Sequence, residues 1–518
     1  MNIPLLINRC VNRFTERIAL VHEDTRLTFR ELEEQTNSIA NNLLSLGLTK
    51  RDRVALLSPN RIELVLGEYG IYKAGLVSVP LNARLSMDET IHMLNNSEAS
   101  AFLIGKEYID EFDKVRDKAE TVKHFMAISN PLDYMMSFKE LLQGPFTPPD
   151  VNIDMDDLCS LRYTSGTTGK LKATMMSHRN RISSTKKRLL IPDVELDQNS
   201  VACHVGPITH ASGAMVLPTW WMGGCNLILN GFDEKILLVT IEEERVTHMF
   251  AAPTMLNMLM AYPDVRKYDL SSLRTIWYGS SPMPVTRIRE ALEIFGPVFI
   301  QGYGQTETAS AITFLSKEDH LVGDDPVKIK RLSSCGVPNL ECDVRVVNAE
   351  GEDVKPGEIG EIIERGDDSM VGYWNDPELT RETIKDGWIY TRDMATVDEA
   401  GYIYIVDRKS DMIISGGFNV YPSEVENAIY THPAVFEAGV IAVPDEIWGE
   451  SVKACVVLKP GESATEEEII IHCKECIASY KKPKSVDFMD ELPKNPYGKV
   501  LRRKLKEKYW VDQERGVH

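Results

Sequence analysis

The segment from Tyr163 to His178 concentrates small hydroxylated residues around two lysines, in the order YTSGTTGKLKATMMSH. Backbone N–H groups of a glycine-rich turn can form a nest that binds anions, and hydroxyl side chains add further donors. Lys172 adds a point charge that suits a phosphate. The residue types therefore predict a phosphate-binding loop, with a generic polar loop as the alternative.

This loop differs from both common nucleotide-binding motifs. A Walker loop needs G-x-x-x-x-G-K-[ST] before a helix, whereas Gly166 and Gly169 are three residues apart and Lys170 precedes Leu171. The segment also lacks a G-x-G-x-x-G turn. Because KLKATMMS alternates like a strand and LCSLRYT precedes the loop, we expect the loop to join two strands.

Composition and charge narrow the class of protein. The 518 residues, 43% apolar and 26% charged, are typical of a soluble globular chain that is too long for one core. The net charge of −19 disfavours nucleic acid and anionic membranes as partners. Residues 480–508 form a basic exception, with ten Lys/Arg against four Asp/Glu. This region either meets a polyanionic ligand or is the solvated face of a last helix.

The N-terminus, the apolar runs and the cysteine spacing indicate where the protein is located and what its cysteines do. The first twenty residues do not resemble a signal peptide, and no apolar run approaches a membrane span. We therefore expect a cytoplasmic chain without stable membrane insertion. Nine cysteines are scattered, and the closest pair, Cys473 and Cys476, lies in the helical pattern TEEEIIIHCKECIASY. This placement favours structural cysteines over a redox or zinc site.

The elements that must position the loop alternate between helix and strand. TFRELEEQTNSIANNLLSLGL predicts a helix that starts at Thr28 with a capping box to Glu31. Strand DRVALLSPN and the helix and strand of RIELVLGEYGIYKAGLVSVPLN continue a βαβ rhythm. Near Ser334 the pattern becomes β-rich, and after Ser410 it becomes α+β. We expect an α/β fold with a large N-terminal domain of layered sheets plus a β-rich subdomain (1–409) and a small mobile C-terminal domain (410–518).

Six motifs occur in order along the chain: YTSGTTGKLK, YGSSPMP, YGQTE, YTRDMA, VDRKSD and LPKNPYGKVLRRKL. Together they resemble the signature segments of the adenylate-forming superfamily, which contains acyl- and aryl-CoA synthetases, luciferases and peptide-synthetase adenylation domains. The first motif departs from the usual TSG-[ST]-TG-x-PKG at Leu171 and Ala173. Arg392 and Asp407 stand where the family usually has glycine. The resemblance covers essentially the whole chain.

The resemblance implies roles for individual residues. Lys499 is the catalytic lysine, Glu307 holds Mg²⁺, Thr164 and His210 take part in catalysis, and Ser410 is the hinge. Tyr303 stacks on adenine, Thr306 contacts phosphate, and Asp393 and Arg408 approach the ribose. The implied ATP- and AMP-binding residues are Thr164, Ser165, Gly166, Thr167, Thr168, Gly169, Lys172, Gly279, Ser280, Ser281, Gln301, Gly302, Tyr303, Gly304, Thr306, Asp393 and Arg408.

A second set of residues is expected to meet coenzyme A. ISGGFNVYPSEVE and DEIWGESVKACVVLKPGE resemble segments of CoA ligases, the second especially those of bacterial aryl-CoA ligases. The resemblance implies a CoA site of Gly416, Gly417, Trp448, Tyr480, Lys482 and Arg84. In it Gly416 and Gly417 let the pantetheine arm pass and Trp448 stacks on the CoA adenine. The alternatives are a core anchor for Trp448 and a plain surface charge for Lys482.

The acyl pocket is the least specified part of the site. VGPITHASG resembles the segment that puts a histidine at the substrate gate, with a satisfied helix-start histidine as the alternative. The expected pocket residues are His210, Ala211, Ser212, Phe250, Gly302, Ala309 and Ser310. They are small or apolar, and the sequence assigns no fixed cation beside them. This set favours a hydrophobic aryl or medium- to long-chain acid.

These features together predict an ATP-dependent carboxylic acid–CoA ligase. It would form an acyl-adenylate and pyrophosphate, and then an acyl-CoA thioester and AMP, with ATP, coenzyme A and Mg²⁺. The expected partner is a small carboxylic acid, with no nucleic acid, and a homodimer is an expectation at family level. Two alternatives are an acyl-AMP ligase that loads a carrier protein and a non-catalytic acyl- or nucleotide-binding homologue.

Overall fold

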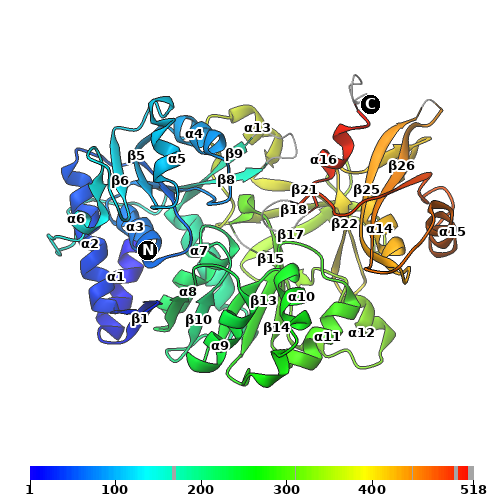
Figure 1. Cartoon of the computed structure of the whole chain (residues 1–518), viewed down its shortest axis with the longest axis horizontal. Helices are drawn as coiled ribbons and strands as arrows, with labels where there is room; N and C mark the ends of the chain where they lie inside the picture. Colours follow the sequence, from blue (N-terminus) through cyan, green and yellow to red (C-terminus); the bar gives the residue numbers. More distant parts are fainter. Residues whose placement is uncertain (166–170, 310, 446, 495–499, 511–518) are drawn as a thin grey trace. The chain divides into compact units, whose positions relative to one another are not determined.

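The computed structural model describes residues 1–165, 171–309, 311–445, 447–494 and 500–510 (Figure 1). The chain divides into two compact units. The first contains Met1–Val344 and Ile363–Tyr390, and the second contains Arg345–Ile362 and Thr391–His518. The boundary at 409/410 stays a prediction. None of the described helices is long and apolar enough to span a membrane.

One sheet of the first unit carries the predicted loop. Its strand order is β19-β9-β8-β4-β3-β5-β6-β7, and β4, β3, β5, β6 and β7 run parallel. The pair β8 and β9 is antiparallel, and β19 runs antiparallel to β9. The strands are β3 (Arg53–Leu57), β4 (Val77–Pro80), β5 (Ala99–Ile104), β6 (His124–Ala127), β7 (Met136–Ser137), β8 (Leu158–Ser165), β9 (Leu171–Ser177) and β19 (Gly372–Tyr373).

A second sheet of this unit has the order β16-β15-β14-β13-β12-β10-β11-β1-β2. Its centre, from β1 to β14, is parallel, and the outer strands at both ends are antiparallel. The strands are β1 (Ile18–His22), β2 (Thr25–Thr28), β10 (Val201–His204), β11 (Cys225–Ile228), β12 (His248–Ala251), β13 (Thr275–Gly279), β14 (Phe299–Gly304), β15 (Ala311–Leu315) and β16 (Val337–Pro338).

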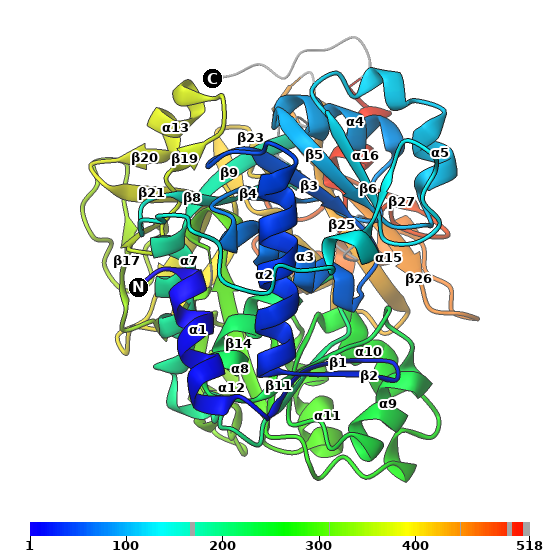
Figure 2. The same cartoon turned by 90° about the vertical axis from the view of Figure 1, so that its left-hand side faces the viewer.

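Helices join these two sheets through one apolar core. Its members come from α1, α2, α3 and α8 and from strands of both sheets, and Figure 2 shows α1 beside α2. The predicted capping box at Thr28 and Glu31 starts α2 and is confirmed. The helices are α1 (Ile3–Phe14), α2 (Phe29–Ser45), α3 (Ile62–Lys73), α4 (Met87–Asn96), α5 (Ile109–Asp113), α6 (Phe138–Leu141), α7 (His178–Leu189), α8 (Val216–Trp221), α9 (Glu234–Glu243), α10 (Pro253–Ala261), α11 (Val285–Phe295), α12 (Pro326–Arg331) and α13 (Pro377–Thr383).

The later part of the chain is β-rich and then α+β, as its sequence predicts. One sheet has the order β17-β18-β21-β20 with β22 beside β21, and another has the order β24-β23-β26-β25 with β27 beside β26. The elements are β17 (Cys342–Val347), β18 (Gly360–Gly366), β20 (Ile384–Lys385), β21 (Trp388–Val397), β22 (Ile403–Arg408), β23 (Ile413–Ser415), β24 (Phe418–Val420), β25 (Val435–Asp445), β26 (Gly449–Leu458), β27 (Ser485–Phe488), α14 (Pro422–Tyr430), α15 (Glu466–Cys476) and α16 (Arg502–Glu507).

The close cysteine pair lies within α15, where the helical pattern placed it. Cys473 is buried in the core of the second unit and Cys476 is exposed, and both are free thiols. This arrangement agrees with the interpretation of structural cysteines.

Candidate active site

The strands on either side of the predicted phosphate loop form an antiparallel pair. β8 ends at Ser165 and β9 begins at Leu171, and Thr164 pairs with Lys172 in the register. This agrees with the prediction of a loop between two strands. Gly166, Thr167, Thr168 and Gly169 lie outside the described residues. Thr164 and Lys172 are therefore paired one residue before and one residue after the ends of the described strands that border the loop.

Glu307, the predicted metal ligand, is held by a tyrosine that sequence reasoning missed. The Tyr373 hydroxyl donates a hydrogen bond of 2.7 Å to Glu307 Oε1. Lys172 Nζ lies 5.7 Å from the centre of the same ring, within cation–π range. Tyr373 reaches this place because β19 pairs with β9. One buried ring thus connects the carboxylate to the lysine of the predicted phosphate loop.

The Glu307 backbone is held by a second long-range contact. Met370 N–H donates a hydrogen bond of 2.8 Å to Glu307 O, and Met370 immediately follows the loop after β18. Tyr373 lies 66 residues from Glu307 along the chain. No local motif around Tyr373 signals this contact, because it arises only from the pairing of β19 with β9. Both the backbone and the side chain of Glu307 are therefore positioned by the segment from 370 to 373.

Strands β13 and β14 approach each other closely where two predicted ATP-site glycines face one another. Gly279 pairs with Gly302 in the parallel register. A Cβ on Gly279 would lie 2.3 Å from Gly302 O, and a Cβ on Gly302 would lie 2.4 Å from Trp277 Nε1. Real Cβ atoms do not come this close to other atoms, so both positions require glycine. The ends of β13 and β14 therefore carry no side chain at positions 279 and 302.

The other predicted ATP-site residues of this unit follow the same strands. Ser280 has a left-handed backbone with φ +70°, which turns the chain sharply after β13, and Ser281 comes next. Gln301, Tyr303 and Gly304 lie on β14, and Thr306 begins the short 3₁₀ segment Thr306–Thr308. The structure therefore brings the predicted residues after β13 and at the end of β14 to the same sheet edge.

Part of the predicted acyl pocket borders an apolar cluster. Phe250 packs, with Leu189, Ala311 and Phe314, against a buried core of Ile191, Val194, Leu196, Met215, Trp277 and Ile300. Ala309 ends the 3₁₀ segment with φ +49°. Ser212 is buried against His204 and Ala211 is exposed, while Ser310 lies outside the described residues. Trp277 and Met215 are apolar members that the sequence did not suggest.

His210 immediately precedes the 3₁₀ segment Ala211–Met215, makes no capping hydrogen bond with its side chain, and is neutral at physiological pH. Its Nδ1 hydrogen-bonds with Thr209 Oγ1 at 2.8 Å. Burial and, to a lesser extent, the nearby Arg162 guanidinium together lower the pKa of His210 to about 4. Arg162 itself donates a 2.8 Å hydrogen bond to Thr209 O. A neutral imidazole can shield or orient a ligand but brings no charge to it.

In the second unit the two predicted ribose residues form an ion pair. Asp393 on β21 and Arg408 on β22 are register partners, with Arg408 Nε 2.9 Å from Asp393 Oδ1. Arg392, which replaces the usual glycine, has a left-handed φ of +62°. Its backbone N–H donates a 3.0 Å hydrogen bond to Glu361 Oε1. A non-glycine residue pays about 1–2 kcal/mol for such a conformation, so the glycine preference at this position is one of backbone geometry.

The predicted CoA residues of this unit gather on an exposed face. Gly416 and Gly417 have φ of +59° and +82°, and a Cβ on Gly416 would lie 2.2 Å from Trp448 Cε3. Trp448 is 47% exposed, so it is not a core anchor. Tyr480 stacks near Phe418 with ring centroids 5.0 Å apart, and Lys484 Nζ lies 4.8 Å from the Trp448 ring centre. Phe418 and Lys484 are additions to the predicted set.

The remaining predicted residues are placed as follows. Ser410 lies in the turn after β22, and Lys482 lies in the turn after α15 with its side chain half-buried. Arg84 lies in the first unit, where its backbone N–H donates a 3.0 Å hydrogen bond to Asn82 Oδ1. Lys499 lies outside the described residues. The described residues contain no group of three or more His, Cys, Asp or Glu side chains suited to hold a metal.

Comparison with known proteins identifies the family. The AMP-binding enzyme family matches residues 7–374, and the AMP-binding enzyme C-terminal domain matches residues 424–499. The chain is 38% identical to the feruloyl-CoA synthase of Amycolatopsis sp. over 95% of this chain and 96% of the relative. It is 33% identical to the long-chain-fatty-acid–CoA ligase of Escherichia coli O157:H7, over 97% of this chain and 93% of the relative. The crystal structure of an anthranilate CoA ligase with anthranoyl-AMP superposes with a TM-score of 0.87 at 28% identity, covering 98% of this chain and 97% of that one.

The chain therefore belongs to the AMP-binding enzyme family and has the fold of the adenylate-forming enzymes. Within that superfamily it lies in the acyl- and aryl-CoA ligase branch. It is an AMP-forming acid–CoA ligase, for which ATP and coenzyme A are substrates.

Proposed function

We propose that this ligase activates a hydrophobic aromatic or medium- to long-chain carboxylic acid. The observation that carries the proposal is the apolar cluster around Phe250, Trp277 and Met215, which adjoins Gly302 and Ala311 at the ends of β14 and β15. Relatives named for ferulic acid and for long-chain fatty acids support the same class of substrate. Apolar side chains stabilise a bound hydrocarbon by removing its surface from water.

The first half-reaction is attack of the acid's carboxylate on the α-phosphate of ATP, which releases pyrophosphate. Lys172 attracts the phosphates, and the Gly279 and Gly302 edge lies along the adenylate without side-chain obstruction. A single carboxylate fits Mg²⁺, which usually binds one or two carboxylates together with phosphate oxygens and water. Glu307, oriented by Tyr373, would hold it, and the bound ion would neutralise phosphate charge. Lys499 stabilises the charge that develops between carboxylate and phosphate.

The nucleotide's ribose and the second half-reaction involve the second unit. Asp393 accepts hydrogen bonds from the ribose hydroxyls, and the ion pair with Arg408 orients that carboxylate. The second unit rotates about Ser410 between the half-reactions, so that Lys499 serves adenylation and the Gly416 face serves thioester formation. Trp448 stacks on the CoA adenine, and the CoA nucleotide is met by Tyr480 and Lys482, with Arg84 as a further cation.

Product analysis tests this proposal. The purified chain is incubated with ATP, Mg²⁺ and a panel of aromatic and straight-chain acids, with and without CoA, and products are identified by mass. Acyl-CoA formed only with CoA, and acyl-AMP formed without it, is the expected result. Acyl-AMP alone in both conditions would point to a carrier-protein ligase, and the absence of any product would point to a non-catalytic homologue.

A lysine variant separates the two half-reactions. Lys499→Ala is expected to lose adenylate formation but to convert supplied acyl-AMP and CoA into thioester. Equal loss of both steps would contradict the assigned role of Lys499. Homodimer formation and a cytoplasmic location are further parts of the proposal, checked by light scattering and by cell fractionation.

A further inference from the structure

An arginine next to the apolar cluster is buried without a carboxylate partner. Arg188, near the end of α7, is 8% exposed. Its Nη1 donates hydrogen bonds to Ser184 Oγ at 2.7 Å and to Ser184 O at 3.1 Å. The guanidinium has five N–H donors, and its Nε and Nη2 atoms have no hydrogen-bond partner among the described residues. Most of its donors are therefore available to a bound molecule.

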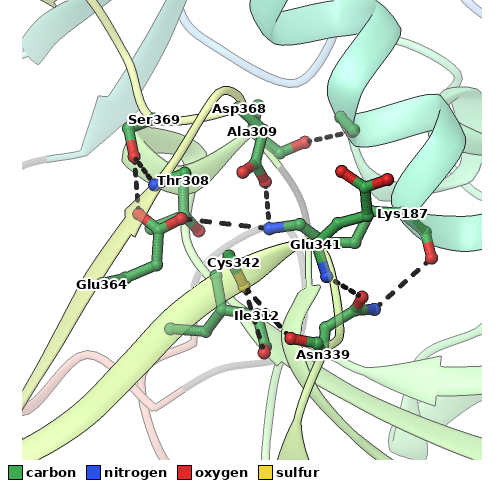
Figure 3. Close-up of polar contacts among 12 residues, drawn as sticks. Lys187, Thr308, Ala309, Ile312, Asn339, Glu341, Cys342, Glu364, Asp368 and Ser369 are labelled. Carbon is green, nitrogen blue, oxygen red and sulfur yellow. Dashed lines mark hydrogen bonds and ion pairs between the residues drawn. The ribbon is translucent and has the colours of Figure 1, made fainter.

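The acidic groups around α7 are already committed to other cations. Lys187 forms an ion pair with Asp368 inside the protein, and Glu364 lies 3.9 Å from the same ammonium (Figure 3). Burial and the neighbouring Asp368 carboxylate raise the pKa of Glu364, which keeps it largely protonated. On the other side, Arg162 pairs with Glu68. Asp368 attracts Arg188 electrostatically but forms its ion pair with Lys187, and no carboxylate of the described residues lies within ion-pair distance of Arg188.

A second cation on the same helix increases the local positive charge. Arg181 lies two turns before Arg188, and its Nε is buried without a hydrogen-bond partner among the described residues. Burial and, to a lesser extent, the proximity of Arg181 together lower the pKa of Arg188 to about 10, while the Asp368 carboxylate opposes this shift. The group still carries its charge at neutral pH. A buried charge of this kind is unfavourable unless an acceptor meets it, and a ligand can supply that acceptor.

Two contacts place Arg188 close to residues of the predicted acyl pocket. The Ser184 hydroxyl that accepts from Arg188 donates a 3.1 Å hydrogen bond to Ala309 O. The next residue, Leu189, packs in the cluster that includes Phe250 and Trp277. The Glu307 side chain, two residues before Ala309, is bonded instead to Tyr373 of β19. Ser184 thus links the Arg188 guanidinium to Ala309, a predicted pocket residue, while Glu307 of the same segment is bonded to β19 instead.

We propose that Arg188 is a specificity residue that binds an oxygen acceptor at the far end of the acid. The substrate is then a hydrophobic acid with a second oxygen, either a carbonyl or a carboxylate, in addition to the carboxylate that is adenylated. This rests on the proposed function, because it assumes that the apolar cluster holds the acid. A site built to hydrogen-bond a substrate oxygen rejects analogues without it, since the donor is then left unpaired.

Matched acids test the proposal in the wild-type chain. One series is octanoate, 7-oxooctanoate and octanedioate, and another is 3-phenylpropanoate with its 4-acetyl and 4-carboxyl derivatives. Pyrophosphate release gives kcat/KM for each acid with ATP and CoA. We expect the oxygen-bearing member of at least one series to exceed the plain acid by about tenfold or more. The keto and carboxylate arms show which acceptor is preferred.

Variants assign that preference to Arg188. Arg188→Met should bring the ratio of kcat/KM for the oxygen-bearing and plain acids to about one, chiefly by loss of the oxygen-bearing acid. Arg188→Gln, which keeps donors but no charge, should lower the preference for octanedioate more than that for 7-oxooctanoate. Lys186→Met, an exposed neighbour on α7, is the matched control and should keep the wild-type ratio. Turnover of plain acids shows that each variant is folded.

The outcomes distinguish a failure of the role proposed for Arg188 from a failure of the proposed function. A wild-type ratio of about one in both series would overturn the role of Arg188 while leaving the proposed function intact, and so would an unchanged ratio in a folded Arg188→Met. Failure of every acid to give acyl-AMP or acyl-CoA would instead contradict the proposed function. If Arg188→Met does not fold, the wild-type series and Arg188→Gln still decide the question.

Discussion

The two regions expected to meet the substrates are built in opposite ways. At the ends of β13 and β14 the fit comes from backbone, where the neighbours of Gly279 and Gly302 leave no room for a Cβ. On the predicted CoA face the fit comes from exposed side chains, with Phe418 57%, Trp448 47% and Tyr480 50% exposed. A substitution in the first region must move strands, whereas one in the second removes a contact. The first region should therefore couple stability to activity, and the second should not.

The difference suits the two chemistries. Transfer to the α-phosphate needs reacting groups held in one geometry, which closely packed strands provide. Coenzyme A must enter and leave in each turnover, and an exposed aromatic surface can bind it without a closed cavity. Unfolding and kinetics measured on the same variants should therefore separate the two regions.

The largest effect is expected from Gly279→Ala. The new Cβ would meet Gly302 O of the paired strand, so β13 and β14 must separate. We expect a loss of about 3 kcal/mol in the free energy of unfolding and a fall in kcat/KM of about 100-fold. Urea unfolding measures the loss of stability, and pyrophosphate release measures the fall in kcat/KM. Gly231→Ala, whose Cβ would have no neighbour within 4 Å, is the control. A stable and active Gly279→Ala would show that β13 and β14 can accommodate a Cβ at this position.

A buried carboxyl in the first unit should make stability depend on pH. Burial and Asp368 raise the pKa of Glu364 to about 8, above the value of about 4.5 in the unfolded chain. The folded state then holds the proton more tightly, so stability is greatest at low pH and falls as pH rises through this range. Relative to Glu364→Gln, the wild type should lose roughly 3 kcal/mol between about pH 5 and about pH 8.

Urea unfolding at several pH values measures this difference between Glu364→Gln and wild type. Glu507→Gln, an exposed substitution in the second unit, serves as the comparison and should follow the wild-type profile. Parallel curves for wild type and Glu364→Gln would mean that Lys187 keeps both carboxylates ionised in the folded state.

Tyr373→Phe should affect catalysis while sparing the fold. The change removes the 2.7 Å hydrogen bond to Glu307 but keeps the ring beside Lys172. A hydrogen bond to a charged group contributes about 1.5–3 kcal/mol, so we expect kcat to fall by about tenfold or more. Adenylate formation at varied Mg²⁺ is the measurement, with Tyr390→Phe as a matched control. An unchanged kcat would remove Tyr373 from the positioning of Glu307.

The smallest effect is expected on the CoA face. Trp448→Ala should raise KM for CoA by about fivefold, with KM for ATP and the free energy of unfolding unchanged. Ile447→Ala, at an 83% exposed neighbour, is the control. Gly416→Ala should act partly by displacing the Trp448 ring, because its Cβ would lie 2.2 Å from Cε3. The two changes should therefore be non-additive in a double-mutant cycle. Additive losses would give Gly416 a role independent of Trp448.

Local signals in the sequence predict much of this structure. The Thr28 capping box, the β8–β9 pair and the helix around Cys473 each depend on residues close together in the chain. The contacts of Glu307 with Tyr373 and of Lys187 with Asp368 depend on strand pairing and helix packing over 66 and 181 residues. A local sequence motif cannot predict contacts between residues so far apart in the chain.

The same limit explains why a cation near the acyl pocket escaped sequence reasoning. On α7, Lys186, Lys187 and Arg188 form a basic run that would ordinarily be a solvated surface. In the structure Lys186 is exposed while Lys187 and Arg188 are buried, because the helix turns the latter two inward. Which side of a charged helix faces the core is decided by its neighbours. Hydrophobic periodicity cannot predict which of three consecutive basic residues is buried, because all three are polar.

The antiparallel course of β8 and β9 has a consequence for how phosphate charge is met. In many nucleotide-binding proteins the loop leads straight into a helix, whose N-terminal partial positive charge faces the phosphates. Here the seven residues of β9 come first, so the start of α7 lies roughly 20 Å along the chain from Leu171. The field of a helix end fades within about one turn. On the proposed function, attraction for the triphosphate near β9 therefore comes from Lys172 and not from a helix end, which makes nucleotide affinity more sensitive to ionic strength than in a helix-based site.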